Sequence, residues 1–202
     1  VEGNIAPHEY YRRGDVVSGK ETFYDSWDDD HAMGYVYDFG ENNAGLIKLK
    51  IKGEKGQRVV LQLYERPNKD SGKPDYTNIH FFPEGFVQRN IYICKGGEEE
   101  VFVPDFTYHG YRYCWVTGIT EKQATSGLLT YLVASSDLKQ RTFFSCSDEV
   151  TNKLWDASLR SDRANFFYFP TDCPHREKNG WTGDASVSSE HMVMKLGVDN
   201  SY

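Results

Sequence analysis

The sequence lacks long apolar runs and any concentration of positive charge. No apolar stretch approaches the ~20 residues needed to span a bilayer, so we expect no membrane insertion. Lysine and arginine number 23 against 30 aspartates and glutamates, giving a net charge of −7, and they form no basic stripe. Nucleic acid is therefore not an expected partner. No signal peptide opens the chain, and because it begins with Val1 instead of Met we expect that an upstream segment was removed or never included.

Cysteine is also scarce. The four cysteines show no Cys-x-x-Cys spacing and are too few for a disulfide scaffold; they are Cys94, Cys114, Cys146 and Cys173. We expect mostly free, buried thiols, with a Cys94–Cys114 bridge between strands as the alternative. The cysteines leave periplasmic, secreted and cytoplasmic locations all open.

The chain has enough apolar material for a packed core. Hydrophobic residues make up 39% of the 202 residues and aromatic residues 15%, which argues against general disorder. This length allows one large domain, or one ordinary domain and the start of another. Residues 1–33 are polar and irregular, and we interpret them as a linker or the tail of a preceding domain.

Alternating apolar residues predict a series of strands across residues 34–140. Ile47, Leu49 and Ile51 alternate with lysines, which is typical of a strand with one buried face. Similar alternation marks Val59, Leu61 and Leu63; Val87, Ile91 and Ile93 or their alternates; Val101 and Val103; and the stretches YRYCWVTGI and GLLTYLVAS. Six or more short strands separated by glycine turns, without a helical pattern between them, predict an antiparallel β-sandwich.

The period changes to that of helices from residue 141 to residue 202. Val150, Leu154, Ala157 and Ser161 fall on one face of a predicted helix, for which Ser145 or Ser147 is the expected cap. Asp184 is expected to cap a second helix that Gly197 ends. We interpret this region as the opening of a larger helical domain, because two helices joined by a long loop do not make a domain alone.

The loop between these helices, PTDCPHREKNGWTGD, is unusually rich in ionisable groups. If it folds back, Asp172, Glu177 and Asp184 converge, and like charges raise proton affinity so that one carboxyl can act as a general acid. Carboxylates also bind vicinal hydroxyls, and the ring of Trp181 suits the apolar face of a sugar. Arg176 and Lys178 are suited to holding these charges in register.

Each of these residues also has a purely structural interpretation. Asp184 is a suitable helix cap, Glu177 a suitable solvated loop acid, and Trp181 a suitable core residue. A metal site built from Asp172, Cys173, His175 and Glu177 is a further alternative, but neither His191 nor Cys146 completes a familiar zinc pattern. We therefore expect no metal and no cofactor.

The sequence PTDCPHREKNGWTGDA closely resembles the signature D-C-P-Q-R-(D)-E-x-x-G-W-T-G-D-A of bacterial α-L-rhamnosidases, glycoside hydrolase family 78. The stretches YDFGENNAGLIKLKIKGEKGQRVVLQLYE, PDFTYHGYRYCWVTGI and FFSCSDEVTNKLWDASLRS extend the resemblance to about residues 34–196. It implies a β-sandwich at 34–140, followed at 141–202 by the first helices of an (α/α)6 barrel. The implied activity is release of terminal α-L-rhamnose with inversion.

The resemblance also implies a role for each loop residue. Glu177 corresponds to the general acid, Asp172 and Asp184 to carboxylates that hold the rhamnose hydroxyls, and Trp181 to an aromatic lining of the sugar site; Arg176 is taken as a further substrate-binding residue. His175 departs from the pattern, which more often has Gln. The expected partner is a rhamnose-containing glycoside or saccharide, and the oligomeric state is left open.

An inverting hydrolase needs a general base set ~6.5–9.5 Å from the acid. The family places this glutamate far downstream, and Glu190 carries no mark of such a role. We therefore expect the chain to be a fragment with half of a catalytic pair. The alternatives are a non-catalytic carbohydrate-binding sandwich, or a six-hairpin glycosidase for another sugar.

Overall fold

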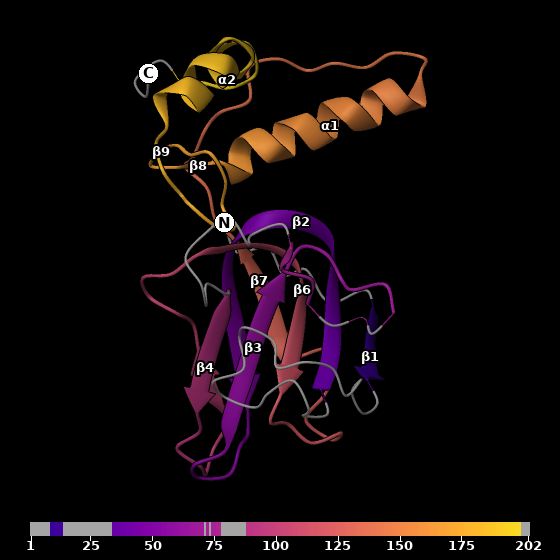
Figure 1. Ribbon diagram of the computed structural model, residues 1–202, viewed down its shortest axis with the longest axis vertical. Coiled ribbons are helices and arrows are strands. Elements are labelled where there is room, and N and C mark those ends of the chain that lie inside the picture. The colour runs from indigo at the N-terminus through magenta and orange to yellow at the C-terminus, as the bar shows by residue number, and fades with distance from the viewer. Residues whose placement is uncertain (1–8, 14–33, 71, 73, 78–87, 199–202) are drawn as a thin grey trace.

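The computed structural model describes residues 9–13, 34–70, 72, 74–77 and 88–198. Figure 1 shows an antiparallel sheet with two helices, α1 and α2, lying together at one end. The strands are β1 (Glu9–Arg13), β2 (Gly34–Ile51), β3 (Arg58–Tyr64), β4 (Arg89–Ile93), β5 (Glu100–Phe102), β6 (His109–Thr117) and β7 (Leu129–Val133). Their order is β1-β2-β6-β3-β4, with β5 and β7 also paired to β2. The predicted mainly β, antiparallel fold followed by helices is confirmed.

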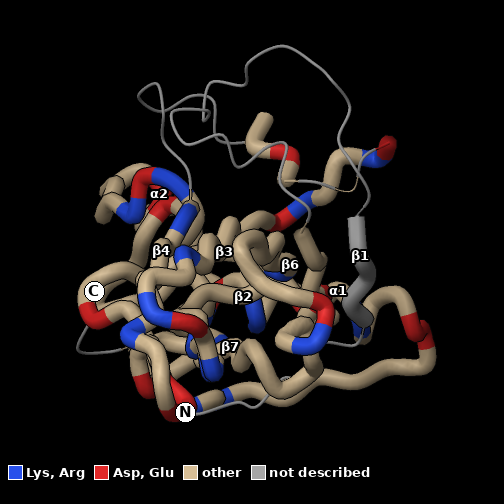
Figure 2. The backbone as a smooth tube through the Cα atoms, turned by 90° about the horizontal axis from the view of Figure 1, so that it is seen from below, with Lys and Arg blue, Asp and Glu red and all other residues tan. Residues whose placement is uncertain are grey.

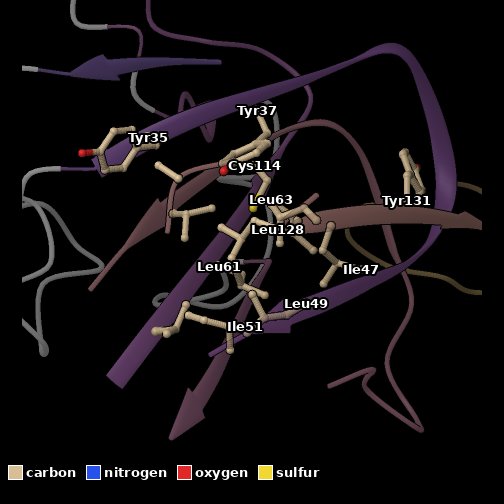
Figure 3. Packing of buried hydrophobic residues seen from close by; sticks show 14 of the residues in the cluster. Tyr35, Tyr37, Ile47, Leu49, Ile51, Leu61, Leu63, Cys114, Leu128 and Tyr131 are labelled. Atoms are coloured by element: carbon tan, nitrogen blue, oxygen red, sulfur yellow. The ribbon is translucent and has the colours of Figure 1, made fainter. Parts of the chain in front are cut away.

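The two halves of the sheet are joined by the long strand β2. Its first part, Gly34–Asp38, pairs with β1 and β6. After an irregularity between Asp38 and Asn43, its second part pairs with the start of β6 and then with β7 and β5. Such an irregularity bends a strand and increases its twist. The sandwich is therefore a single curled sheet, and Tyr37 and Ile47, from the two parts of β2, enter the same core (Figure 3).

The alternation predicted the buried faces of the central strands correctly and those of the outer strands in part. Ile47, Leu49 and Ile51 are buried, as are Val59, Leu61 and Leu63. Ile91, Ile93 and Val101 are instead exposed, by 37%, 52% and 57%. The alternates Tyr92 and Phe102 pack against the core and stack at 5.0 Å, because a ring buries more apolar area than Ile or Val. Val87 lies outside the described residues.

Two further predictions concern the N-terminal segment and the cysteines. Within the expected linker 1–33, β1 pairs along its whole length with β2, and the rest of that segment lies outside the described residues. All four cysteines are free, three of them buried, so the prediction of mostly free thiols is confirmed and the alternative Cys94–Cys114 bridge is wrong.

The first helix, α1, spans Glu149–Ala164. Its cap is Asp148, whose carboxylate accepts a hydrogen bond from the Thr151 amide at 2.6 Å, so the prediction of Ser145 or Ser147 is wrong. The four residues that the spacing placed on one face are exposed in this chain: Val150 and Leu154 by 74% and 68%, and Ala157 and Ser161 as well. The buried residues of α1 are Leu159 and Asp162.

A short hairpin and a second helix follow α1. The hairpin consists of β8 (Phe166–Phe167) and β9 (Phe169–Pro170), and α2 spans Thr182–Lys195. Trp181 occupies the cap position, so Asp184 lies in the first turn and not at the cap as predicted. The C-cap is Leu196, directly before Gly197, where the helix was predicted to stop. Within the described ranges, no helix is long and apolar enough to cross a membrane.

The helices pack through a small cluster of their own. Leu159 of α1 and Met192 of α2 meet Phe166, Leu196 and Val198. The Lys195 carbonyl accepts a hydrogen bond from the Arg141 amide at 2.7 Å, which ties the end of α2 to the segment leaving the sheet.

Basic and acidic residues are interspersed along the described backbone (Figure 2).

Candidate active site

The loop between β9 and α2 is closed by hydrogen bonds at both ends. Asp172 and Asn179 bond reciprocally: the Asp172 amide donates to the Asn179 carbonyl at 3.0 Å, and Asp172 Oδ1 accepts from the Asn179 amide at 2.9 Å. The Thr171 amide donates to the Asn165 carbonyl at 2.7 Å, which joins the loop to the end of α1. These bonds fix the Asp172 backbone and one carboxylate oxygen.

Cys173 connects Asp172 to Glu177. Its thiol donates to Asp172 Oδ2 over 2.8 Å, and its sulfur accepts from the Glu177 amide at 3.4 Å. Burial, and then the hydrogen bond to Asp172, raises the pKa of Cys173, so the thiol keeps the proton that it donates. Both oxygens of Asp172 are therefore held by the loop itself.

Glu177 is paired with the aromatic residue four positions further on. Trp181 Nε1 donates to Glu177 Oε2 at 2.8 Å, while Arg176 Nε lies 3.9 Å from Glu177 Oε1. The Glu177 side chain is only 11% exposed, so it is not a freely solvated loop acid. Trp181 is 53% exposed, which rules out the interpretation as a core residue.

The sheet holds the loop from below. Lys178 Nζ donates to the Tyr108 carbonyl at 2.6 Å and lies 4.8 Å from the centre of the Tyr108 ring. A Cβ added to Gly110 would stand 2.7 Å from Pro174 Cγ, so only glycine allows this close approach of β6. His175 Nδ1 lies 3.8 Å from Glu65 Oε1, and burial is the main cause that lowers the pKa of His175.

A hollow of about 430 Å³ opens beside this loop, within the size range of ligand sites. Its walls come from the end of α1, the start of the loop and the first turns of α2; they include Asp162, Asn165, Asp172, Asp184 and His191. A second hollow of about 360 Å³ shares Ser161, Asn165 and Asp172 with it and reaches the sheet at Asn42 and Glu65.

The structure thus brings the predicted residues together in two groups. Asp172 and Asp184 line the same hollow. Glu177, Trp181 and Arg176 contact one another at the neighbouring turn, but they are not among the residues that line it. Cys173 joins the two groups through its contacts with Asp172 and Glu177.

The metal alternative finds no geometric support in the described residues. Cys173 directs its thiol to Asp172, and His175 faces Glu65 in the sheet. Within the described part of the chain, no three His, Cys, Asp or Glu side chains are grouped as ligands.

Sequence reasoning missed Asp162 and did not assign His191 to the hollow. Asp162 lies on α1 and His191 on α2, and they face each other at 3.4 Å. One signal was available: His191 and Lys195 are four residues apart on α2, so they share a helix face, and both lie within 3.4 Å of Asp162. The face of α2 that carries His191 and Lys195 lies beside Asp162 because α1 and α2 cross there, and the sequence does not reveal this crossing.

The β-module and the helical module each match a domain of known glycoside hydrolases. Residues 30–135 match the model of the bacterial α-L-rhamnosidase concanavalin-like domain, and residues 139–202 match that of the bacterial α-L-rhamnosidase 6 hairpin glycosidase domain. The chain belongs to the bacterial α-L-rhamnosidase family, as the signature in its loop indicated.

Individual relatives agree with this family. The chain is 33% identical over 168 residues to an α-L-rhamnosidase of Formosa agariphila, a match that covers 83% of this chain and 18% of the relative. An α-L-rhamnosidase structure from Dictyoglumus thermophilum has a TM-score of 0.75 at 28% identity and covers 96% of this chain and 21% of its own. A Streptomyces avermitilis α-L-rhamnosidase complexed with L-rhamnose has a TM-score of 0.74 at 27% identity, with 95% and 17% covered. The chain therefore spans about a fifth of the length of these relatives.

Proposed function

We propose that this chain supplies the acid half of the active site of an inverting α-L-rhamnosidase. Glu177 is the general acid, Asp172 and Asp184 hold hydroxyls of the terminal sugar, and Trp181 and Arg176 complete its binding. The proposal is carried by one observation: Asp172 and Asp184 share one hollow, while Cys173 links Asp172 to the turn that holds Glu177. The division into a sandwich at 34–140 and a helical part from 141 belongs to the same proposal.

The reaction needs a proton at the departing oxygen and an activated water on the other face of the sugar. Glu177 donates its proton to the glycosidic oxygen as the bond from that oxygen to the anomeric carbon breaks. A general base outside these 202 residues removes a proton from the water that attacks the anomeric carbon. The products are the free aglycone and a sugar of inverted anomeric configuration.

The substrate is held by groups that suit a deoxyhexose. The carboxylates of Asp172 and Asp184 accept charge-assisted hydrogen bonds from hydroxyls. The half-exposed Trp181 ring offers an apolar surface for the C–H face or the methyl group of rhamnose. Its N–H is already bonded to Glu177, so ring and acid are fixed relative to each other.

The test is Glu177→Gln in the full-length enzyme, assayed on two rhamnosides with different leaving groups. On a rhamnosyl disaccharide, whose leaving alcohol needs protonation, we expect kcat to fall by about 10²- to 10⁴-fold. On 4-nitrophenyl α-L-rhamnoside the fall should be much smaller, because nitrophenolate leaves without a proton. Glu149→Gln is the matched control, since Glu149 is exposed on α1, where it pairs with Lys153 at 2.7 Å.

Equal losses on both substrates, or no loss at all, would contradict the role of Glu177. A panel of aryl rhamnosides, fucosides and glucosides separates rhamnose from other sugars. NMR of the first product anomer tests inversion, and retention of configuration would overturn that part of the proposal.

A further inference from the structure

A buried charge network lies between the two helices, next to the hollow. Lys195 of α2 is 7% exposed and Asp162 of α1 is 5% exposed, with Lys195 Nζ 3.0 Å from Asp162 Oδ2 and 2.5 Å from Ser158 Oγ. Nζ also lies 5.4 Å from the centre of the Trp155 ring. Replacing a buried ion pair by apolar residues often leaves stability unchanged or raises it, so stability alone does not explain these charges.

The other oxygen of Asp162 points toward a histidine. Asp162 Oδ1 lies 3.4 Å from His191 Nδ1, a buried nitrogen that makes no hydrogen bond among the described residues, so the two groups face each other as charge and dipole. The His191 side chain as a whole is 43% exposed, so much of the ring is open to solvent. Both residues line the hollow that also contains Asp172 and Asp184.

Resting on the function proposed above, we propose that His191 contacts the terminal sugar, binding one of its hydroxyls, and that Asp162 is its positioning residue. Lys195 fixes Asp162 Oδ2 and leaves Oδ1 to the imidazole. A carboxylate beside Nδ1 favours the tautomer with hydrogen on Nδ1, so Nε2 is left as an acceptor. His191 then adds a neutral acceptor to the two carboxylates.

A purely structural role of His191 and a role in binding the sugar predict different kinetics for His191 variants. If the network only joins α1 to α2, variants at His191 lower the melting temperature and leave the kinetics of the folded enzyme unchanged. If His191 binds a hydroxyl, its loss weakens catalysis for substrates that carry that hydroxyl and not for the substrate that lacks it.

The experiment measures kcat/KM of the full-length enzyme on 4-nitrophenyl α-L-rhamnoside and on its 2-, 3- and 4-deoxy analogues. For His191→Ala we expect a loss of roughly tenfold on the parent sugar, the size of one hydrogen bond. One deoxy analogue should show almost no further loss, because its missing hydroxyl is the partner of His191. His191→Gln should recover part of the activity, since its amide oxygen can accept the same bond.

Two further variants complete the design. Glu190→Gln, at the adjacent exposed position of α2, is the matched control and should leave kcat/KM unchanged. Asp162→Asn keeps the shape of the side chain. It should lower kcat/KM on the same substrates as His191→Ala, namely those that carry the hydroxyl bound by His191. The His191 variants are decisive if Asp162→Asn fails to fold, because His191 is half-exposed.

The outcomes separate this inference from the function on which it rests. If Glu177→Gln shows the leaving-group dependence but His191→Ala loses the same factor on every analogue, or nothing on any, His191 does not bind a hydroxyl. If Glu177→Gln has no effect, the proposed function itself is wrong. If His191→Ala lowers kcat/KM on the parent rhamnoside but not on one of its deoxy analogues, His191 is a specificity residue for the hydroxyl that this analogue lacks.

Discussion

At the scale of single residues, the contact between sheet and loop includes a buried neutral histidine. His109 begins β6 and is 4% exposed, and neither ring nitrogen has a hydrogen-bond partner within the described residues. Burial, and then the charge of Lys178, lowers the pKa of His109 to about 3. Protonating this ring would place a second positive charge near Lys178, which is itself bonded to the Tyr108 carbonyl.

His109 therefore predicts a dependence of stability on pH. The unfolded chain binds a proton near pH 6.5 and the folded chain only near pH 3, so stability is complete above 6.5 and is lost as pH falls toward 3. We expect His109→Gln to remove this contribution, with a slope of at most about 1.4 kcal/mol per pH unit. Urea unfolding of both proteins across this pH range checks it. Parallel stability curves for the two proteins would show that His109 does not titrate in this way.

At the scale of elements, the loop that carries the proposed general acid packs directly against β6. Gly110→Ala would place a Cβ 2.7 Å from Pro174 Cγ and 3.1 Å from His175 Cβ, and the loop must move to admit it. Because a shift of about 1 Å can cost about 100-fold in rate, we expect kcat/KM of the full-length enzyme to fall roughly ten- to a hundredfold.

Gly127→Ala is the control for this substitution. Its added Cβ would meet nothing closer than Thr125 Oγ1 at 3.9 Å, so activity should be kept. Steady-state kinetics and melting temperatures of both variants give the measurement. A Gly110→Ala enzyme with normal kcat/KM would mean that β6 does not position the loop.

The sequence predicted elements better than it predicted their faces. Alternation succeeded at Ile47 and Leu61, where the strand has one apolar face toward the core. For α1 the helical spacing placed Val150 and Leu154 on one face, whereas the side that packs within the chain contains Asp162, made compatible with burial by Lys195. A pattern of apolar residues cannot reveal a polar contact that depends on a second helix.

The candidate site also has a part that the sequence predicted and a part that only the structure shows. The density of charged residues and the signature singled out Asp172, Glu177 and Asp184; the structure closes the loop that holds the first two through Asn179 and Cys173, and Asp184 lies in the first turn of α2. The pairing of Asp162 with His191 depends on how the helices cross, and no local pattern determines that crossing.

At the scale of the whole molecule, the proposed mechanism divides the catalytic pair. In that proposal the acid is Glu177 of this chain and the base lies outside it. We expect the 202-residue chain alone not to hydrolyse aryl α-L-rhamnosides, measured as release of 4-nitrophenol. Release of rhamnose from a rhamnosyl disaccharide by the chain alone, lost in Glu177→Gln, would show that the chain contains its own base.

The glycine contact between β6 and Pro174 also affects how such enzymes can be recombined. The β-module contacts the loop that carries the proposed acid through Gly110 and Tyr108, so the two modules are not independent of each other. A chimera that joins the helical module of one family member to the β-module of another must therefore keep the β-module residues that contact the loop. Otherwise the contacts around Gly110 and Lys178 have to be redesigned.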